Sequence, residues 1–181
     1  MSLHANAMGA LSAWTAPTPD QVALRSAYLD YLASHEDALC RTSRPGHLTA
    51  SALVLDPQAR RVLLTLHPKV GRWLQLGGHC EPGDPTLAAA AVREATEESG
   101  LPALSVTGGP LRLDRHHVRC GSDGSAAEHL DVQYLALASL DHPTVTSQES
   151  LELRWWPVGA LPEDTDDSVR ALVSRALTLQ G

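Results

Sequence analysis

A glycine- and proline-rich stretch, residues 77–85, leads directly into an alanine-rich run, residues 87–95, and Gly100 follows shortly after. Alanine has the highest helix propensity of all residues, so this run favours a helix. Asp84 is a good N-cap, Pro85 suits the first helical position, and glycine is common where a helix stops. The sequence therefore predicts a helix that begins at a tight backbone turn and ends at Gly100.

Three glutamates of this helix share one stripe, because Glu94, Glu97 and Glu98 are spaced i, i+3 and i+4. Like charges at this spacing destabilise an isolated helix. A solvated acidic face, with Arg93 pairing to Glu97, is the simpler interpretation. The Gly-Gly turn just upstream favours a metal site instead, because glycine lets a ligand approach the backbone closely. Clustered carboxylates select Mg²⁺ or Mn²⁺, usually together with substrate phosphates.

Patterns elsewhere in the chain predict a mixed sheet packed between helices. Residues 1–19 carry no clear periodicity and are expected to form a flexible arm, followed by a single domain over residues 20–181. An N-terminal helix is expected within residues 20–40, with Asp20 as its cap. The other expected elements are a hairpin over 47–55 and 61–66 with its turn at 56–58, strands over 111–119, 130–138 and 151–158, and a closing helix over 169–179.

Composition excludes two classes of partner. The chain has 14 basic and 21 acidic side chains, a formal net charge of −7, whereas proteins that bind a nucleic-acid polymer usually show a basic excess. Its uncharged apolar stretches are far shorter than the roughly 20 residues of a membrane span, so no membrane partner is expected. Three widely spaced cysteines without a basic and apolar leader favour a reducing, cytoplasmic location.

Residues 78–101, GHCEPGDPTLAAAAVREATEESGL, resemble the signature of the Nudix hydrolase (MutT-like) family. That signature is a Gly, five residues, a Glu, seven residues, then Arg-Glu-aliphatic-x-Glu-Glu-x-Gly-aliphatic. Residues 93–101 match the second half at every charged and glycine position. In the first half, Asp84 stands where the family has Glu, and eight residues instead of seven separate it from Arg93. The resemblance assigns no subfamily.

The resemblance implies a fold and an activity. The fold is an α/β/α sandwich with a mixed β-sheet between helices, to which this chain adds its N-terminal helix. The activity is hydrolysis of a phosphoanhydride bond in a nucleoside diphosphate linked to another moiety, by water activated on Mg²⁺ or Mn²⁺. The implied metal ligands are the Gly78 carbonyl, Glu94, Glu97 and Glu98, while Arg93 would orient the glutamates.

A general base and the substrate contacts are less directly marked. Many family members place a glutamate ahead of a later strand that carries a tryptophan, which makes Glu149 the first candidate, with Glu152 and Glu94 as alternatives. The substrate is expected to be a nucleotide or another small diphosphate. Four residues are candidate substrate contacts, either in the motif loops or on one face of a later strand: Arg72, His79, His129 and Asp131.

Two other functions and two structural questions stay open at this point. A Nudix fold can serve as a non-catalytic nucleotide-binding or regulatory module, and an isopentenyl diphosphate isomerase-like enzyme shares the fold. The apolar stripe of the N-terminal helix predicts either packing on the domain or a homodimer. Cys80, Cys120 and the nearby histidines lack the paired CxxC or HxxxH spacing typical of a zinc site.

Overall fold

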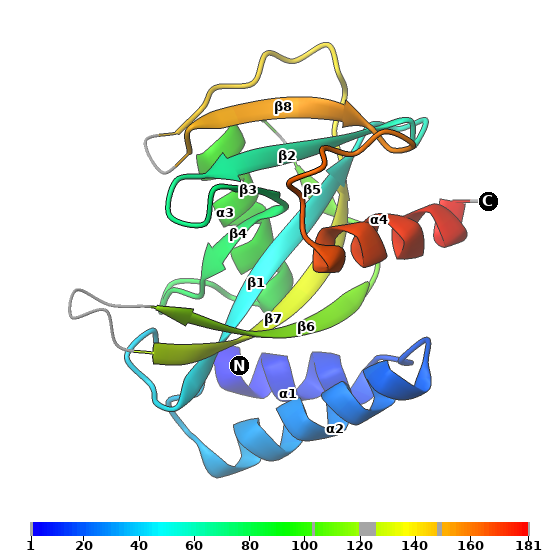
Figure 1. Ribbon diagram of the computed structural model, residues 1–181. Helices are drawn as coiled ribbons and strands as arrows, with labels where there is room; N and C mark the ends of the chain where they lie inside the picture. Colours follow the sequence, from blue (N-terminus) through cyan, green and yellow to red (C-terminus); the bar gives the residue numbers. More distant parts are fainter. Residues whose placement is uncertain (1, 103, 120–125, 148–149, 181) are drawn as a thin grey trace.

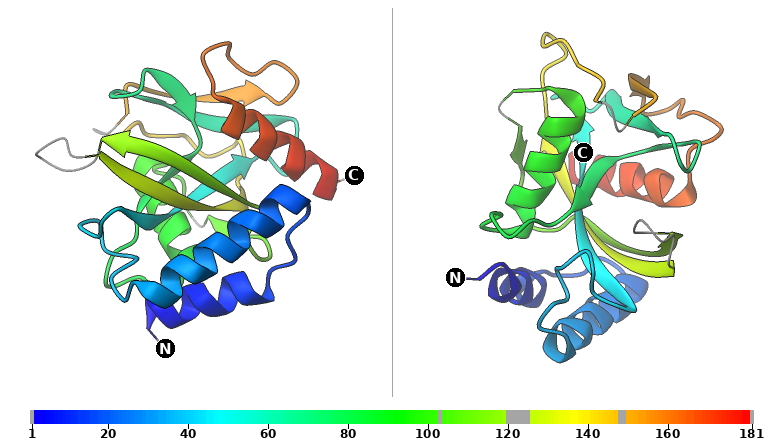
Figure 2. Two further views of the ribbon diagram at one scale, coloured as in Figure 1. Left: turned by 60° about the horizontal axis from the view of Figure 1, so that its bottom comes forward. Right: turned by 90° about the vertical axis from the view of Figure 1, so that its left-hand side faces the viewer.

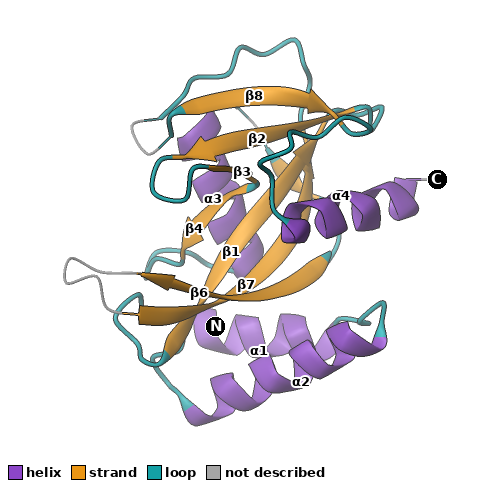
Figure 3. Cartoon of the chain, viewed as in Figure 1, coloured by secondary structure: helices purple, strands orange, loops and turns teal. Residues whose placement is uncertain are grey.

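The computed structural model describes residues 2–102, 104–119, 126–147 and 150–180. Helices and strands alternate irregularly along the chain (Figure 1 and Figure 3), and no described helix has the length and apolar content needed to cross a membrane. In chain order the elements are α1 (Leu3–Ala13), α2 (Pro19–Ser34), β1 (Gly46–Leu55), β2 (Arg61–His67), β3 (Arg72–Leu74), β4 (Leu76–His79), α3 (Leu87–Ser99), β5 (Ser105–Val106), β6 (Arg112–Arg119), β7 (Ala126–Leu137), β8 (Glu152–Pro157) and α4 (Asp167–Gln180).

The sheet is mixed and is built around the parallel pair β1 and β7, in which Gly46 lies opposite Glu128 and Leu55 opposite Leu137. The other strands join antiparallel: β2 and β4 pair with β1, β3 and β8 with β2, and β5 and β6 with β7. The expected hairpin is confirmed as β1 and β2, with the carboxylate of Asp56 accepting bonds from the backbone of the turn.

Helices cover both faces of this sheet, with α3 on one side and α4 on the other (Figure 2). The side chains of β1 alternate accordingly: Leu48, Ala50, Ala52 and Val54 belong to the core that includes α3, and Leu53 and Leu55 to the core that includes α4. A period of two is what a strand buried on both faces requires. The predicted α/β/α arrangement is confirmed.

The expectation of a flexible arm is wrong for residues 3–13, which form α1 with Ser2 as the N-cap. Ala7 and Leu11 of this helix are fully buried, and α1 contacts both α2 and α3. Asn6 also accepts a hydrogen bond from Leu87 N (3.1 Å), the first residue of α3. Contacts with distant residues therefore order a segment whose own sequence shows no periodicity.

The expected N-terminal helix is present as α2, with shifted ends. It begins at Pro19 behind the N-cap Thr18 instead of Asp20, and it ends at Ser34. Its apolar stripe is covered within the chain, since Tyr28 and Leu32 are buried against the core.

Helix α2 also protects the outer edge of β6. Unpaired edge strands expose backbone groups that can pair with another chain, and native proteins often cover them with a helix. Here the buried Gln21 amide donates to Leu113 O (3.0 Å) and accepts from Leu113 N (2.7 Å), while the Tyr28 hydroxyl donates to Asp114 O (2.5 Å). The N-terminal extension is thus part of the folded unit, placed at one end of the sheet (Figure 2).

Candidate active site

The glycine turn and the acidic helix meet through strand β4. This strand pairs with β1, so that Gly78 lies opposite Ala50 and Gly77 opposite Ser51. A Cβ atom on Gly78 would lie 2.6 Å from Glu94 Oε2, closer than real Cβ contacts come. Glycine at position 78 is required because its backbone lies directly against the Glu94 carboxylate.

Helix α3 carries the three motif glutamates and ends, as expected, at Gly100, which adopts the left-handed conformation (φ 66°). Its N-cap is Thr86, not Asp84. Glu98 is buried, and its Oε2 accepts a hydrogen bond from Gly77 N (3.1 Å). Glu97 lies on the exposed side of the stripe. Two of the glutamates therefore face the glycine strand, and the third faces solvent.

Arg93 connects the loop to these glutamates. Its Nε donates to Asp84 Oδ1 (3.0 Å) and its Nη2 to Asp84 Oδ2 (3.0 Å), a bidentate pair, and Nη2 also donates to His79 O (2.9 Å). Its Nη1 donates to Glu94 Oε1 (3.0 Å) and to Glu97 Oε2 (3.2 Å). Arg93 thus donates hydrogen bonds to the carboxylates of Asp84, Glu94 and Glu97.

Asp84 stands where the motif has a glutamate, and it is the bidentate partner of Arg93. Burial by itself would raise the pKa of Asp84, but hydrogen bonds from Arg93 and from the Glu81 backbone hold it below its usual value, and the bonds to Asp84 raise the pKa of Arg93 in turn. The shorter acid and the extra residue before Arg93 therefore preserve the ion pair instead of disrupting it.

Asp131 lies inside the sheet. Its carboxylate accepts hydrogen bonds from the hydroxyls of Thr49 (2.9 Å) and Ser51 (2.6 Å) and from Gln75 Nε2 (3.3 Å), and burial raises its pKa. These partners come from β1 and from the residue before β4. Asp131 therefore ties the parallel strands together, and its burial leaves 3% of its surface for any substrate contact.

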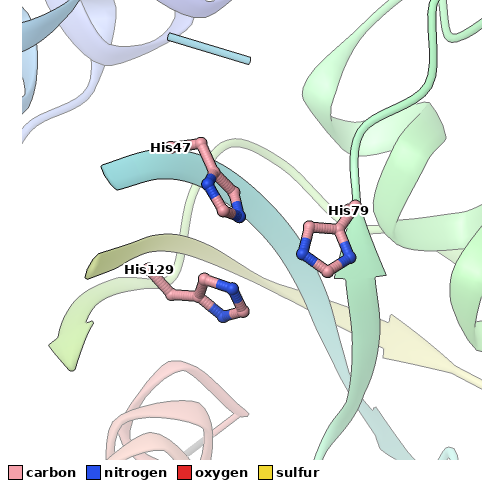
Figure 4. A group of neighbouring side chains, drawn as sticks. All are labelled: His47, His79 and His129. Atoms are coloured by element: carbon pink, nitrogen blue, oxygen red, sulfur yellow. The ribbon is translucent and has the colours of Figure 1, made fainter. Parts of the chain in front are cut away.

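His79 and His129, expected as separate substrate contacts, lie together with a third histidine, His47 (Figure 4). The three ring centroids are 4.9 to 5.2 Å apart, and one nitrogen of each ring lies within 4.8 Å of the others. Burial lowers the pKa of His79 to about 4 and that of His129 to about 3, and it also lowers the pKa of His47. All three rings are thus neutral at pH 7.

Sequence patterns did not single out His47. The available signal was the polar alternation His47, Thr49, Ser51 along a strand, which marks one polar face of β1. Which residues lie beside His47 on that face depends on the parallel register of β1 and β7, which places His47 opposite His129. Short-range sequence patterns carry no information about this register.

For the remaining candidate residues, no described contact links them to the motif glutamates or to the three histidines. Arg72 is exposed at the start of β3, opposite His67 of β2, and Glu152 is exposed at the start of β8. Glu149 lies outside the described residues, as does Cys120.

Comparison with known proteins gives the same fold and a family. No curated protein matched the sequence. A NUDIX-family hydrolase from Clostridium perfringens is 24% identical over 75% of this chain and 98% of its own, with a TM-score of 0.61. A C. elegans Ap4A hydrolase is 16% identical over 74% and 96% (TM-score 0.56). The NUDIX domain of Shewanella oneidensis NrtR, complexed with ADP ribose, is 21% identical over 84% and 97% (TM-score 0.57).

The family model described as NUDIX domain matches residues 45–177. This range covers all strands of the sheet, the glycine turn and helix α3 with Arg93 and the three glutamates. The chain therefore belongs to the NUDIX domain family.

Proposed function

We propose that the protein hydrolyses a phosphoanhydride bond in a nucleoside diphosphate linked to another moiety, and that it requires Mg²⁺ or Mn²⁺. One observation carries the proposal: the backbone of Gly77 and Gly78 lies against the carboxylates of Glu98 and Glu94. This contact brings the backbone of β4 and two acidic side chains to one place.

The donor set fits a hard divalent cation. Glu94, Glu97, Glu98 and the Gly78 carbonyl supply oxygen ligands, which Mg²⁺ and Mn²⁺ prefer. We propose these four as the metal ligands. A divalent ion bound there would polarise a phosphoryl oxygen and lower the pKa of the attacking water. Arg93 would keep Glu94 in its orientation through the 3.0 Å bond from Nη1 to Oε1.

For the general base we propose Glu149, with Glu152 and Glu94 as the alternatives. Glu152 begins β8, which pairs with β2, and Glu94 already lies beside the Gly78 backbone. A base must reach the attacking water within hydrogen-bond distance, directly or through one further water. Replacing each glutamate by glutamine and comparing the pH profiles of turnover distinguishes the three.

The substrate class rests on the chemistry shared by the structural neighbours. One is an Ap4A hydrolase and another binds ADP ribose, and both compounds contain a nucleoside attached to phosphates that are joined by phosphoanhydride bonds. We propose Arg72, His79 and His129 as substrate contacts. Asp131 is reassigned to holding β1 and β7 together, because its carboxylate is buried and bonded within the sheet.

Location and assembly complete the proposal. Cys40 and Cys80 are free thiols, which fits the cytoplasmic location that we propose. Homodimerisation stays a prediction. It was prompted by the apolar stripe of α2, and in the structure this stripe packs on the domain of the same chain.

The test is a substrate screen with matched variants. Purified protein is incubated with nucleoside triphosphates, nucleotide sugars, dinucleoside polyphosphates and coenzyme diphosphates, each with Mg²⁺, with Mn²⁺ and with chelator, and products are separated by anion exchange. We expect metal-dependent cleavage of one class. Glu98→Gln should lower turnover by at least about 100-fold, since loss of even an outer-shell partner of a metal site costs about 10–100-fold.

Glu98→Gln should keep its thermal stability, because a glutamine carbonyl can still accept the bond from Gly77 N. Glu163→Gln is the matched control, since Glu163 is exposed in the loop before α4. Full metal-dependent activity of Glu98→Gln would refute the ligand assignment. Nucleotide-dependent stabilisation without cleavage would instead support the non-catalytic module, and double-bond movement would support the isomerase.

A further inference from the structure

Three histidines on three different strands converge on one face of the sheet, on the opposite side from α3. His47 comes from β1, His129 from β7 and His79 from β4, and Figure 4 shows the rings turned toward one another. The registers His47 opposite His129 and Thr49 opposite His79 produce this meeting. Residues far apart in the chain, from His47 to His129, therefore contribute to one small cluster of imidazoles.

The ring nitrogens are close enough for a shared ligand. One nitrogen from each ring lies within 4.8 Å of the other two. In a tetrahedral zinc site with Zn–N bonds of about 2.0–2.1 Å, two ligand nitrogens are separated by about 3.3 Å. To reach that separation, the nitrogens would have to approach one another by up to about 1.5 Å through side-chain rotation.

Unmet polar groups point to a ligand at the same place. His47 is fully buried; the Ser43 backbone lies near its ring, but neither ring nitrogen makes a hydrogen bond of normal geometry with a described residue. His129 Nε2 is likewise buried without such a partner. Buried polar atoms in native proteins are nearly always bonded, and an orphan group often indicates an ion or a water. A metal ion would accept the lone pairs that no protein donor satisfies.

The donor chemistry selects the metal. Three imidazole nitrogens suit Zn²⁺ and other borderline transition metals, whereas Mg²⁺ prefers oxygen ligands. Three protein ligands also leave a fourth position open, as in zinc sites that bind water or substrate. One carboxylate lies close to the cluster through a fourth histidine. The ring centroids of His129 and His116 are 5.5 Å apart, and His116 Nδ1 is hydrogen-bonded to Asp114 Oδ2 (2.9 Å).

We propose that His47, His79 and His129 form a binding site for one Zn²⁺ ion, distinct from the oxygen-ligand site of Glu94, Glu97 and Glu98. His79 follows Gly78 directly on β4, so the two sites lie on opposite faces of the same strand. The zinc ion would clamp β1, β4 and β7 beside the glycine turn and would leave one position for water or for a phosphate oxygen of the substrate.

The experiment uses the full chain without a polyhistidine tag, stripped of metal with chelator and returned to buffer with excess Mg²⁺. Zn²⁺ binding is measured by isothermal titration calorimetry, and Co²⁺ binding by its visible absorption, which reports nitrogen ligation at low coordination number. We expect one Zn²⁺ per chain, a visible Co²⁺ band that Zn²⁺ removes, and a higher Tm with Zn²⁺.

Variants assign the ligands. His129→Gln should weaken Zn²⁺ binding by at least about 100-fold, more than the 10–100-fold cost of losing an outer-shell partner. The exposed His142→Gln and the neighbouring-site variant Glu98→Gln should both bind Zn²⁺ like the original chain. His79→Gln serves as a second ligand variant should His129→Gln fold poorly, and circular dichroism checks the fold of each.

Three outcomes would overturn the proposal. They are binding of Zn²⁺ no tighter than that of Mg²⁺, equal Zn²⁺ affinity in the His129→Gln and His79→Gln variants, and loss of the Zn²⁺ isotherm in Glu98→Gln. Tight binding of inorganic phosphate that needs no metal and is lost in His129→Gln would also overturn it, because it would identify an anion site. None of these readouts depends on the hydrolase activity, so failure here is distinguishable from failure of the proposed function.

Discussion

Replacing Arg93 by Met should destabilise the fold measurably, because Arg93 neutralises a buried carboxylate. Asp84 is 6% exposed at its side chain, and two of the five hydrogen bonds of Arg93 go to its two oxygens. Removing one partner of a buried ion pair costs about 3–5 kcal/mol. Because the Arg93 side chain is 21% exposed, we expect Arg93→Met to lower the free energy of unfolding by about 3 kcal/mol, the low end of this range. For a domain of this size that loss lowers Tm by roughly 6–12 °C.

The assay is thermal unfolding followed by circular dichroism at pH 7, with Arg115→Met as the control. Arg115 pairs with Glu128 but is 45% exposed, so its loss should cost at most about 1 kcal/mol, or about 2–4 °C. A double-mutant cycle with Asp84→Asn should show that the two effects are strongly non-additive, because each variant removes the same bidentate pair.

The pair also predicts a pH dependence with a defined sign. The pKa of Asp84 in the folded protein lies below its ordinary value of 3.8. A depressed carboxyl pKa stabilises the fold above the unfolded-state pKa, and that stability is lost as pH falls through the folded-state pKa. The difference in Tm between the original chain and Asp84→Asn should therefore be constant near neutral pH and shrink below about pH 4.

Three results would refute this reasoning: a fall in Tm of Arg93→Met no larger than that of Arg115→Met, additive effects in the cycle, or a Tm difference that grows on acidification. Any of them would show that the Arg93 network does not hold the loop in place.

Two further predictions test other parts of the structure. Gly78→Ala should lower turnover at least about 10-fold, because its Cβ would displace the Glu94 carboxylate that it meets at 2.6 Å, whereas Gly83→Ala, with open space around it, should keep full activity in the same assay. Gln21→Leu should lower Tm by about 4–8 °C, because both backbone groups of Leu113 lose buried hydrogen bonds worth about 2 kcal/mol; an unchanged Tm in calorimetry would contradict the edge-protecting role of α2.

Short-range signals predicted the parts of the site that lie close together in the chain. The helix of Glu94, Glu97 and Glu98 and its end at Gly100 follow from propensity and from the need for a left-handed residue at the stop. The bidentate pair between Arg93 and Asp84 became visible only in the structure, where it forms with eight residues between the two partners.

Helix starts were less predictable than helix interiors. Asp20 and Asp84 are as good N-caps as threonine, yet Thr18 and Thr86 cap α2 and α3. Several residues near each start can cap equally well, and long-range contacts decide among them, as when Arg93 binds Asp84 and so removes it from the capping position. Losing a capping side chain altogether costs about 1 kcal/mol, less than breaking one buried ion pair.

The sequence by itself determined the family, the acidic helix, the glycine turn and the hairpin at Asp56, because each depends on residues within about twenty positions of one another. The tertiary structure alone decided the histidine cluster and the role of α1. His47 and His129 meet because β1 and β7 are parallel, and a shift of one residue in that pairing would turn one ring to the other face of the sheet. The helix of residues 3–13 is likewise ordered by burial of Ala7 and Leu11 in a core that the rest of the chain supplies.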